Sequence, residues 1–271
     1  MTSVLRTNPR IEAARAFREK TGWKAKDIFD LAIAAAPESG AQITQILSVK
    51  PDRAVETFTL RYLGRGFHHR YDIVPDWGWI LDGELTCDLR DGATGRRMFA
   101  QACVVGMALG LNAIRFYAGH MVGAYVWARA GARLEDKTDL LKHLDLRAGL
   151  VKDQLPQETV YDLEYLVRLR QTSDLRKIAN LDHRVQVDEE MFFRAFGWMP
   201  ANHHLAMPAE YEASGFSVKT MTLGQFMLFG LEYPACVEFA HRLQMDRVEA
   251  YTGVPIRARA LAARQSRHLT S

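Results

Sequence analysis

The segment RDGATGRRMF at residues 90–99 follows ELTCDL, which alternates like the end of a strand. It combines Gly92 and Gly95 with the paired cations Arg96 and Arg97. A helix that begins just after a glycine-rich loop directs unpaired backbone N–H groups outward and carries partial positive charge at that end. Such an end can hold a phosphate group, whereas the alternative is an ordinary tight turn into a buried helix.

Two common phosphate-binding motifs do not fit this turn. A dinucleotide-binding fingerprint needs three glycines, and a Walker-type loop needs Gly-Lys followed by Ser or Thr. The segment contains neither pattern, which argues against Rossmann-type binding and nucleotide hydrolysis. The pattern that remains is Arg90-x-x-Ala93-x-Gly95 between a predicted strand and a predicted helix.

This pattern resembles the pyrophosphate-binding turn of the GNAT superfamily of N-acetyltransferases. The motif of that family is Gln/Arg-x-x-Gly-x-Gly/Ala. Arg90 and Gly95 match its first and last positions, and Ala93 stands where the family has its middle glycine.

The resemblance extends to HMVGAYVWARAGARL at residues 120–134. Gly131 matches a family glycine, and Ala132 stands at the following Phe position. Trp127 stands at the family's Tyr position, and His120 at its Asn position. The resemblance covers roughly residues 41–135 and rests on the order of elements together with this spacing.

The resemblance implies that the chain binds acetyl-CoA or another acyl-CoA. The strand ELTCDL would splay from a parallel neighbour, NAIRFYAG, and the gap would admit the pantetheine arm. A backbone N–H near Cys87 and Asp88 would bind the thioester carbonyl and stabilise the oxyanion that forms when an amine attacks. The implied cofactor-binding residues are Cys87, Asp88, Leu89, Arg90, Gly92, Ala93, Thr94, Gly95, Arg96, Arg97, His120 and Trp127.

A general base must take the proton from the attacking amine. Glu84 is the first choice because it lies on the strand that would hold the cofactor, and Asp88, His68 and His69 are further candidates. His68 and His69 are adjacent in a predicted strand, so their side chains should face opposite sides of the sheet.

A general acid must protonate the departing thiolate, and the tyrosine of the family does this. Trp127 cannot, because an indole N–H does not titrate usefully. Tyr125 is the candidate in its place, and Tyr117 also lies close in sequence. Tyr125 is two positions from Trp127, about 200° around a helix, so it should face another direction.

The surrounding elements predict a mixed α/β (α+β) fold of GNAT type. Gly22 should separate two helices within residues 9–36, and period-two segments over residues 41–90 indicate an antiparallel meander. A helix that opens at Thr94 or Gly95, the strand NAIRFYAG and a helix at about residues 121–130 complete a β-α-β-α unit with parallel strands. We therefore expect a mostly antiparallel sheet that is flanked by helices.

Strand signals become sparse after residue 136. DLEYLVRLR, SDLRKIANL, DEEMFFRAFGW and CVEFAHRLQMDRVEAYTG favour helices, and FSVKTMTLGQFML is the one predicted strand or strand-helix unit. The arginine-rich tail IRARALAARQSRHLTS indicates a solvated helix face or a frayed end. His203 and His204 are best explained by a polar loop. The predicted parts are a helical lead-in at residues 1–40, the core at 41–135 and a largely helical extension at 136–271.

Composition limits the class of protein further. The net charge of +3 gives no global argument for nucleic acid or membrane binding. The three cysteines form no C-x-x-C pair or disulfide framework, the N-terminus has no apolar core of signal-peptide length, and no later apolar run is long enough for a membrane span, so we expect a cytoplasmic protein. We expect no metal site, because no further ligands at metal-binding spacing accompany His203 and His204.

The leading hypothesis is a direct acyl-CoA-dependent N-acyltransferase that acts on an amine-bearing small molecule or on a peptide or protein. The alternative is a catalytically inactive GNAT-like interaction or regulatory protein. A protein that binds or modifies nucleic acid is a third possibility, and only the terminal arginines support it. The helical C-terminal half would shape the acceptor site or a contact in a homo-oligomer.

Overall fold

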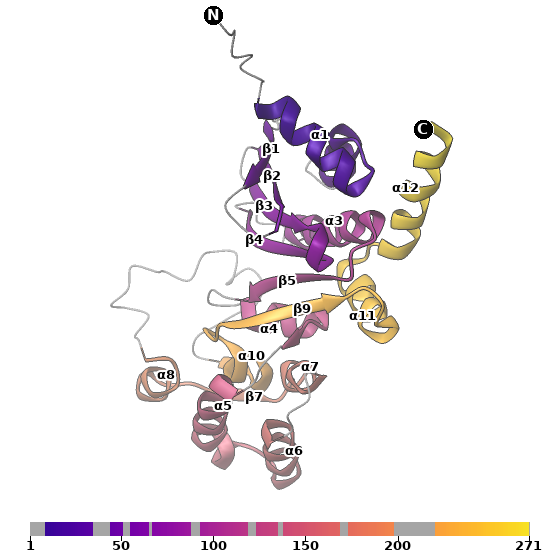
Figure 1. The fold of residues 1–271 in the computed structure, drawn as a ribbon. Helices are drawn as coiled ribbons and strands as arrows, with labels where there is room; N and C mark the ends of the chain where they lie inside the picture. Colours follow the sequence, from indigo (N-terminus) through magenta and orange to yellow (C-terminus); the bar gives the residue numbers. More distant parts are fainter. Residues whose placement is uncertain are drawn as a thin grey trace, which may run out of the picture. The chain divides into compact units, whose positions relative to one another are not determined.

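The computed structural model describes residues 9–34, 44–50, 55–64, 67–87, 93–118, 123–134, 138–168, 173–197 and 220–270. The chain forms two compact units, which are described separately (Figure 1). The first unit comprises Met1–Phe116 and Val237–Ser271, and the second comprises Tyr117–Cys236.

Strands of the first unit form a mixed sheet. Four of them, β1 (Thr44–Lys50), β2 (Thr57–Gly64), β3 (Phe67–Val74) and β4 (Trp79–Cys87), pair in sequence as an antiparallel meander. A short 3₁₀ helix, η1 (Pro75–Trp77), connects β3 to β4. The fifth strand, β5 (Ala113–Ala118), pairs with β4 in parallel. The predicted meander and the predicted parallel strand pair are both confirmed.

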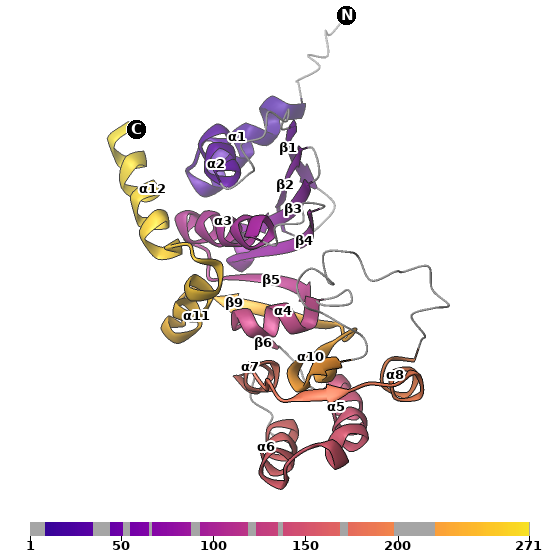
Figure 2. The ribbon, with the colours of Figure 1, turned by 180° about the vertical axis from the view of Figure 1, so that it is seen from behind.

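The helices of this unit are α1 (Pro9–Thr21), α2 (Ala25–Ile33), α3 (Ala93–Leu109), α11 (Arg242–Thr252) and α12 (Ile256–Thr270). Helix α1 contacts β1 and helix α3 contacts β4, whereas α2, α11 and α12 pack against α3. Gly22 separates α1 from α2, and Gly110 ends α3; both adopt the positive φ that glycine tolerates. Figures 1 and 2 show α1, α2 and α3 on the same side of strands β1–β4.

The core of the first unit lies between these helices and the sheet. Phe17 of α1 packs edge-on against Phe58 of β2, with ring centroids 5.2 Å apart. Phe99 of α3 packs similarly against Phe116 of β5 at 5.4 Å. At Gly106 an added Cβ would lie 2.6 Å from the ring of Phe239, so α3 requires glycine for its close approach.

The second unit is mainly helical. Its helices are α4 (Gly123–Ala130), α5 (Thr138–Val151), α6 (Gln157–Arg168), α7 (Ser173–Ala179), α8 (Glu189–Phe196) and α10 (Leu223–Leu228), with η2 (Lys152–Gln154) after α5. Its short strands are β6 (Arg133–Leu134), β7 (Arg184–Gln186), β8 (Thr220–Thr222) and β9 (Tyr233–Glu238). They form two antiparallel pairs, β6 with β9 and β7 with β8.

The predicted strand-helix unit within residues 216–228 is confirmed as β8 followed by α10. The prediction that it is the one strand unit of this half is wrong, because β7 and β9 are also present. In β9, the residues Ala235–Val237 are consecutively buried and show no alternation. A short buried run directly before a helix cannot be distinguished by periodicity from the helix itself.

A single buried cation organises part of the second unit. Arg147 of α5 is 2% exposed, and its guanidinium donates hydrogen bonds to the carbonyls of Ala195, Phe226, Met227 and Phe229 at 2.7 to 3.3 Å. The last three carbonyls lie at the C-terminal end of α10, where unpaired carbonyls carry partial negative charge. Burial lowers the pKa of Arg147 to about 9, so the group remains charged at neutral pH.

The arginine-rich tail forms α12, and much of this helix is exposed to solvent as predicted, but three of its arginines bind neighbouring side chains or carbonyls. Arg257 pairs with Asp246 and Glu249, each at 2.5 Å, and Arg267 stacks over Trp23 at 5.2 Å. Arg264 donates to the carbonyls of Met107 and Ala108 at the end of α3. Residues 237–271 therefore belong to the first unit, although the prediction from sequence assigned them to the helical extension.

Candidate functional site

The strand β4 is paired differently along its two halves. From Trp79 to Asp82 it pairs in parallel with Ala113–Phe116 of β5, and that ladder ends at Asp82 opposite Phe116. Its antiparallel ladder with β3 continues to Cys87. The register with β3 shifts between Arg70 and Tyr71, which leaves Gly83 as an extra residue. Such a bulge bends a strand and re-aims the residues that follow it.

Helix α3 begins shortly after this strand. Thr94 is buried, and the guanidinium of Arg97 donates to its hydroxyl oxygen at 3.4 Å. Arg96 lies over the ring of Tyr251 at 5.5 Å. Neither packing nor a positive φ requires glycine at position 95, because an added Cβ would meet no atom within 4 Å. The first turn of α3 therefore leaves open space beside two exposed arginines.

The predicted phosphate-binding turn is only partly described. Cys87 is the last residue of β4, and Ala93 is the first residue of α3. Asp88, Leu89, Arg90 and Gly92 lie outside the described residues, as does His120. His203 and His204 also fall outside them.

The candidate bases occupy different positions on the sheet. Glu84 lies opposite Arg70 in the ladder between β4 and β3. His69 is fully buried beside Tyr71, with ring centroids 5.0 Å apart, whereas His68 is half-buried. The prediction that the two histidines face opposite sides is confirmed. His69 lies on the face that α1 and α3 cover, together with the buried Tyr71.

The candidate acid and the residue at the family's Tyr position lie on α4 of the second unit. Arg129 donates to the hydroxyl of Tyr125 at 3.1 Å, which holds this hydroxyl along its own helix. Trp127 is half-buried, and its carbonyl accepts from the N–H of Ala132 at 3.1 Å. Gly131 has φ of 88°, so this glycine ends α4 as a cap.

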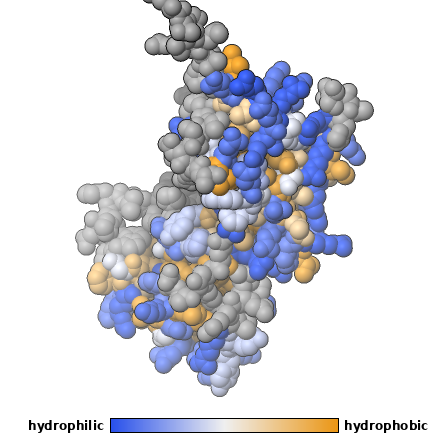
Figure 3. All heavy atoms as spheres, in the orientation of Figure 1, coloured by the Kyte–Doolittle hydropathy of each residue, from blue (hydrophilic) through white to orange (hydrophobic). Residues whose placement is uncertain are grey.

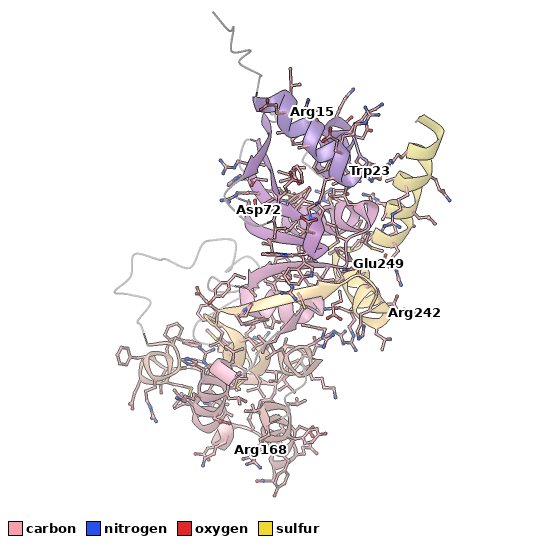
Figure 4. All side chains as sticks on the ribbon, in the orientation of Figure 1. Arg15, Trp23, Asp72, Arg168, Arg242 and Glu249 are labelled. Carbon is pink, nitrogen blue, oxygen red and sulfur yellow. The ribbon has the colours of Figure 1, made fainter. Side chains whose placement is uncertain are left out.

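A polar group on the other face of the first unit's sheet was not singled out from the sequence. The hydroxyl of Thr59 donates to Asp72 at 2.6 Å, and Arg70 lies 3.8 Å from the same carboxylate. Arg115 of β5 stacks on the ring of Trp79 at 3.3 Å. Figure 4 shows Asp72 at the strands and Trp23 among the helices of this unit. The alternation of charged residues within apolar strands was the signal that could have found this group.

A pocket lies between α5 and α6 of the second unit. This pocket of about 240 Å³ is lined by charges of both signs, including Asp145, Lys152, Glu164 and Arg168. Arg168 pairs with Glu164 at 3.8 Å along the same helix. The lining thus combines charges of both signs with apolar side chains such as Leu155 and Val160, and it does not favour a ligand of one net charge.

Comparisons with protein-family models, with curated proteins and with solved structures found no match. Within the described ranges, no three histidine, cysteine or acidic side chains gather closely enough to hold a metal ion. The helices of the described chain include none with the length and apolar character to cross a membrane.

Proposed function

We propose that this chain is an acyl-CoA-dependent N-acyltransferase of GNAT type, which transfers an acyl group, most simply acetyl, directly to an amine. One observation carries the proposal: the parallel ladder between β4 and β5 ends at Asp82, while β4 continues to Cys87 and α3 begins at Ala93. Parallel strands that stop pairing beside the start of a helix can receive an extended ligand arm whose phosphates lie at that helix.

Acyl-CoA has the parts that this arrangement requires. Its pantetheine arm would lie beside the second half of β4, where backbone groups of a strand can pair with its amides. Its pyrophosphate would lie at residues 92–97, near the open space at Gly95 and the charges of Arg96 and Arg97.

The proposed reaction has one nucleophilic step. The amine nitrogen of the acceptor attacks the thioester carbonyl, a backbone N–H near Cys87 and Asp88 stabilises the oxyanion, and the C–S bond then breaks. Loss of one such donor costs about 2.7 to 4 kcal/mol of transition-state stabilisation in other enzymes. Glu84 is the proposed acceptor of the amine proton, and Tyr125 or water would protonate the thiolate.

Direct binding tests this proposal. Calorimetric titration of the full chain with acetyl-CoA, and with longer acyl-CoA, should give saturable binding. The same ligands should raise the unfolding temperature, because a ligand that binds only the folded state stabilises it. Absence of both effects with every acyl-CoA would refute the proposal.

The second candidate is a GNAT-like protein without catalysis. Trp127 favours it, because an indole stands where the family has its acid. The two candidates differ in turnover: the enzyme releases free CoA when an amine is added, and the inactive protein does not. The side chains of Cys103 and Cys236 are buried and form no disulfide, which suits the reducing cytoplasm in which we propose that either protein works.

A further inference from the structure

The ladders define which residues share the face of the first unit's sheet that is opposite α1 and α3. Thr59, Asp72, Leu81 and Arg115 form one row across β2, β3, β4 and β5. The next row consists of Arg61, Arg70 and Glu84. Buried apolar residues such as Phe58, Ile73 and Ile80 occupy the other face. We call the half-buried guanidinium groups of Arg61, Arg70 and Arg115 the arginine face.

Two of these cations oppose each other directly. Arg61 and Arg70 are cross-strand partners in the antiparallel ladder between β2 and β3. Like charges in this position destabilise a sheet, since their side chains leave the sheet on the same face within about 5 Å of each other. The pair therefore lowers the stability of the fold, and this cost favours a role of the two arginines in binding.

Asp72, one of the two carboxylates in these rows, satisfies these cations only in part. Asp72 accepts a 2.6 Å hydrogen bond from Thr59 and lies 3.8 Å from Arg70. Within the part of the chain that the structure describes, the buried Nε atoms of Arg61 and Arg70 have no hydrogen-bond partner. A guanidinium has five N–H donors, so this pair keeps donors for a further acceptor.

The half-buried state of these groups distinguishes them from an ordinary solvated surface. The side chain of Arg70 is 31% exposed, and that of Asp72 is 17% exposed. Arg115 is held flat against Trp79 at 3.3 Å, one residue before the ladder between β4 and β5 ends. Partial removal from water strengthens the attraction of such cations for an oxyanion.

We propose that the arginine face binds the anionic group of the acceptor, so that the acceptor is an amine that also carries a carboxylate or a phosphate. Arg61 and Arg70 would share the oxyanion through forked hydrogen bonds. Glu84, the proposed base, lies next to Arg70 in the same row and one strand nearer β5. The anion would thus be held on β2 and β3 while the amine faces β4. The role of the ligand as an acceptor rests on the proposed acyl transfer, whereas the binding of its anionic group does not.

Matched ligands test the binding directly. The full chain is titrated at constant ionic strength with phosphoethanolamine and ethanolamine, and with glycine and glycinamide. We expect binding of the member that carries the anionic group in at least one pair and none of the counterpart that lacks this group. The pair that responds identifies phosphate or carboxylate as the group. Equal behaviour of both members in both pairs would overturn the inference.

Variants assign the binding to the arginines. Arg61→Gln and Arg70→Gln should each weaken the binding of the responding anion by about tenfold or more. Arg15→Gln is the matched control, because Arg15 is a highly exposed arginine of the same unit. Unchanged binding in both sheet variants would reject the assignment.

Stability without ligand separates binding from structural support. Arg61→Gln should unfold at the same temperature as the wild-type protein or at a higher one, because it removes the repulsion from Arg70. A loss of both stability and binding would show that Arg61 is structural and would overturn the inference.

Titration with acetyl-CoA separates this inference from the proposed function. Arg61→Gln should bind acetyl-CoA as the wild-type protein does. If acetyl-CoA binds and the anionic ligands are not preferred, the inference that the arginine face binds an anion is wrong, and the proposal of acyl transfer stands. If the anion binds through Arg61 and no acyl-CoA binds, the anion site stands and acyl transfer falls.

Discussion

At the scale of single residues, glycines of one helix have opposite roles. Gly106 is required, because a Cβ there would overlap the ring of Phe239, whereas a Cβ at Gly95 would meet nothing. The sequence shows both as glycine within MFAQACVVGMAL or just before it, and no local pattern separates them. Only the packing distinguishes a glycine that the fold needs from one that leaves space for a ligand.

Gly95→Ala tests that distinction. The variant should be as stable as the wild-type protein or more stable by up to about 1 kcal/mol, since alanine favours a helix. It should bind acyl-CoA about tenfold or more weakly, because the added methyl group occupies the proposed phosphate position. Denaturant unfolding and calorimetry give the two quantities.

Gly106→Ala is the control on the same helix. It should lose about 1 to 3 kcal/mol of stability through overpacking against Phe239. Wild-type affinity for acyl-CoA in Gly95→Ala would remove the main support for a cofactor at this turn.

At the scale of elements, an ion pair joins the consecutive helices α11 and α12. Glu249 of α11 accepts a hydrogen bond from the backbone N–H of Arg257 at 2.8 Å, and it also pairs with that side chain. A carboxylate at the first turn of α12 complements the positive end of the helix. Hydrophilic residues predominate over the region of α11 and α12 in Figure 3, yet several of them are bound to neighbouring elements.

The stability that Glu249 provides should depend on pH. Burial alone would raise the pKa of its carboxyl group, but the hydrogen bonds from Arg257 outweigh this and lower the pKa below its ordinary value. The contribution is therefore present above the unfolded-state pKa and is lost as pH falls through the folded-state pKa.

Glu249→Gln should be less stable than the wild-type protein at pH 7, by about 0.5 kcal/mol as for an exposed ion pair. The difference between the two should shrink as pH falls in thermal unfolding measured across the acid range. Glu190→Gln, in an exposed pair 3.9 Å from Arg194, is the control and should change little. A difference that stays constant across the acid range would contradict the role of the charge.

Elements with a clear period were predictable, and short or non-local ones were not. The meander was visible because its strands alternate, and the break at Gly22 because glycine adopts positive φ there. β6 has only two residues, and β9 is buried without alternation, so neither leaves a periodic signal. The arginine face was not predicted, because the pairing of Arg61 with Arg70 depends on the register between two strands. Neither strand's sequence specifies that register alone.

At the scale of the whole molecule, the chain forms one unit from two separated segments and a second unit from the residues between them. Linear boundaries drawn from helix and strand content miss this arrangement, because residues 237–271 have helical patterns like those of the second unit. Their contacts with α3 decide their grouping, and Arg264 makes two of them.

Arg147 gives a test of the independence of the units. Arg147→Met leaves the carbonyls around the end of α10 without their charged donor, at a cost of about 3 kcal/mol. Amide hydrogen exchange should therefore accelerate within residues 117–236 and remain unchanged in β2, β3 and α3.

Arg194→Met, which removes an exposed arginine of the second unit, should leave exchange unchanged throughout. Equal acceleration in both units after loss of Arg147 would mean that they unfold as one.

The hydrogen bond from the N–H of Phe239 to the carbonyl of Asn112 closes the first unit where the chain leaves it and re-enters it. The point at which the chain leaves the first unit therefore lies next to the point at which it returns, as at the two ends of a hairpin loop. A gene can lengthen, shorten or exchange what lies beyond such a junction without disturbing the part before it. The sheet and helices of the first unit can therefore be inherited intact while the length of the second unit changes, provided that the second unit keeps α4 with the proposed acid, Tyr125.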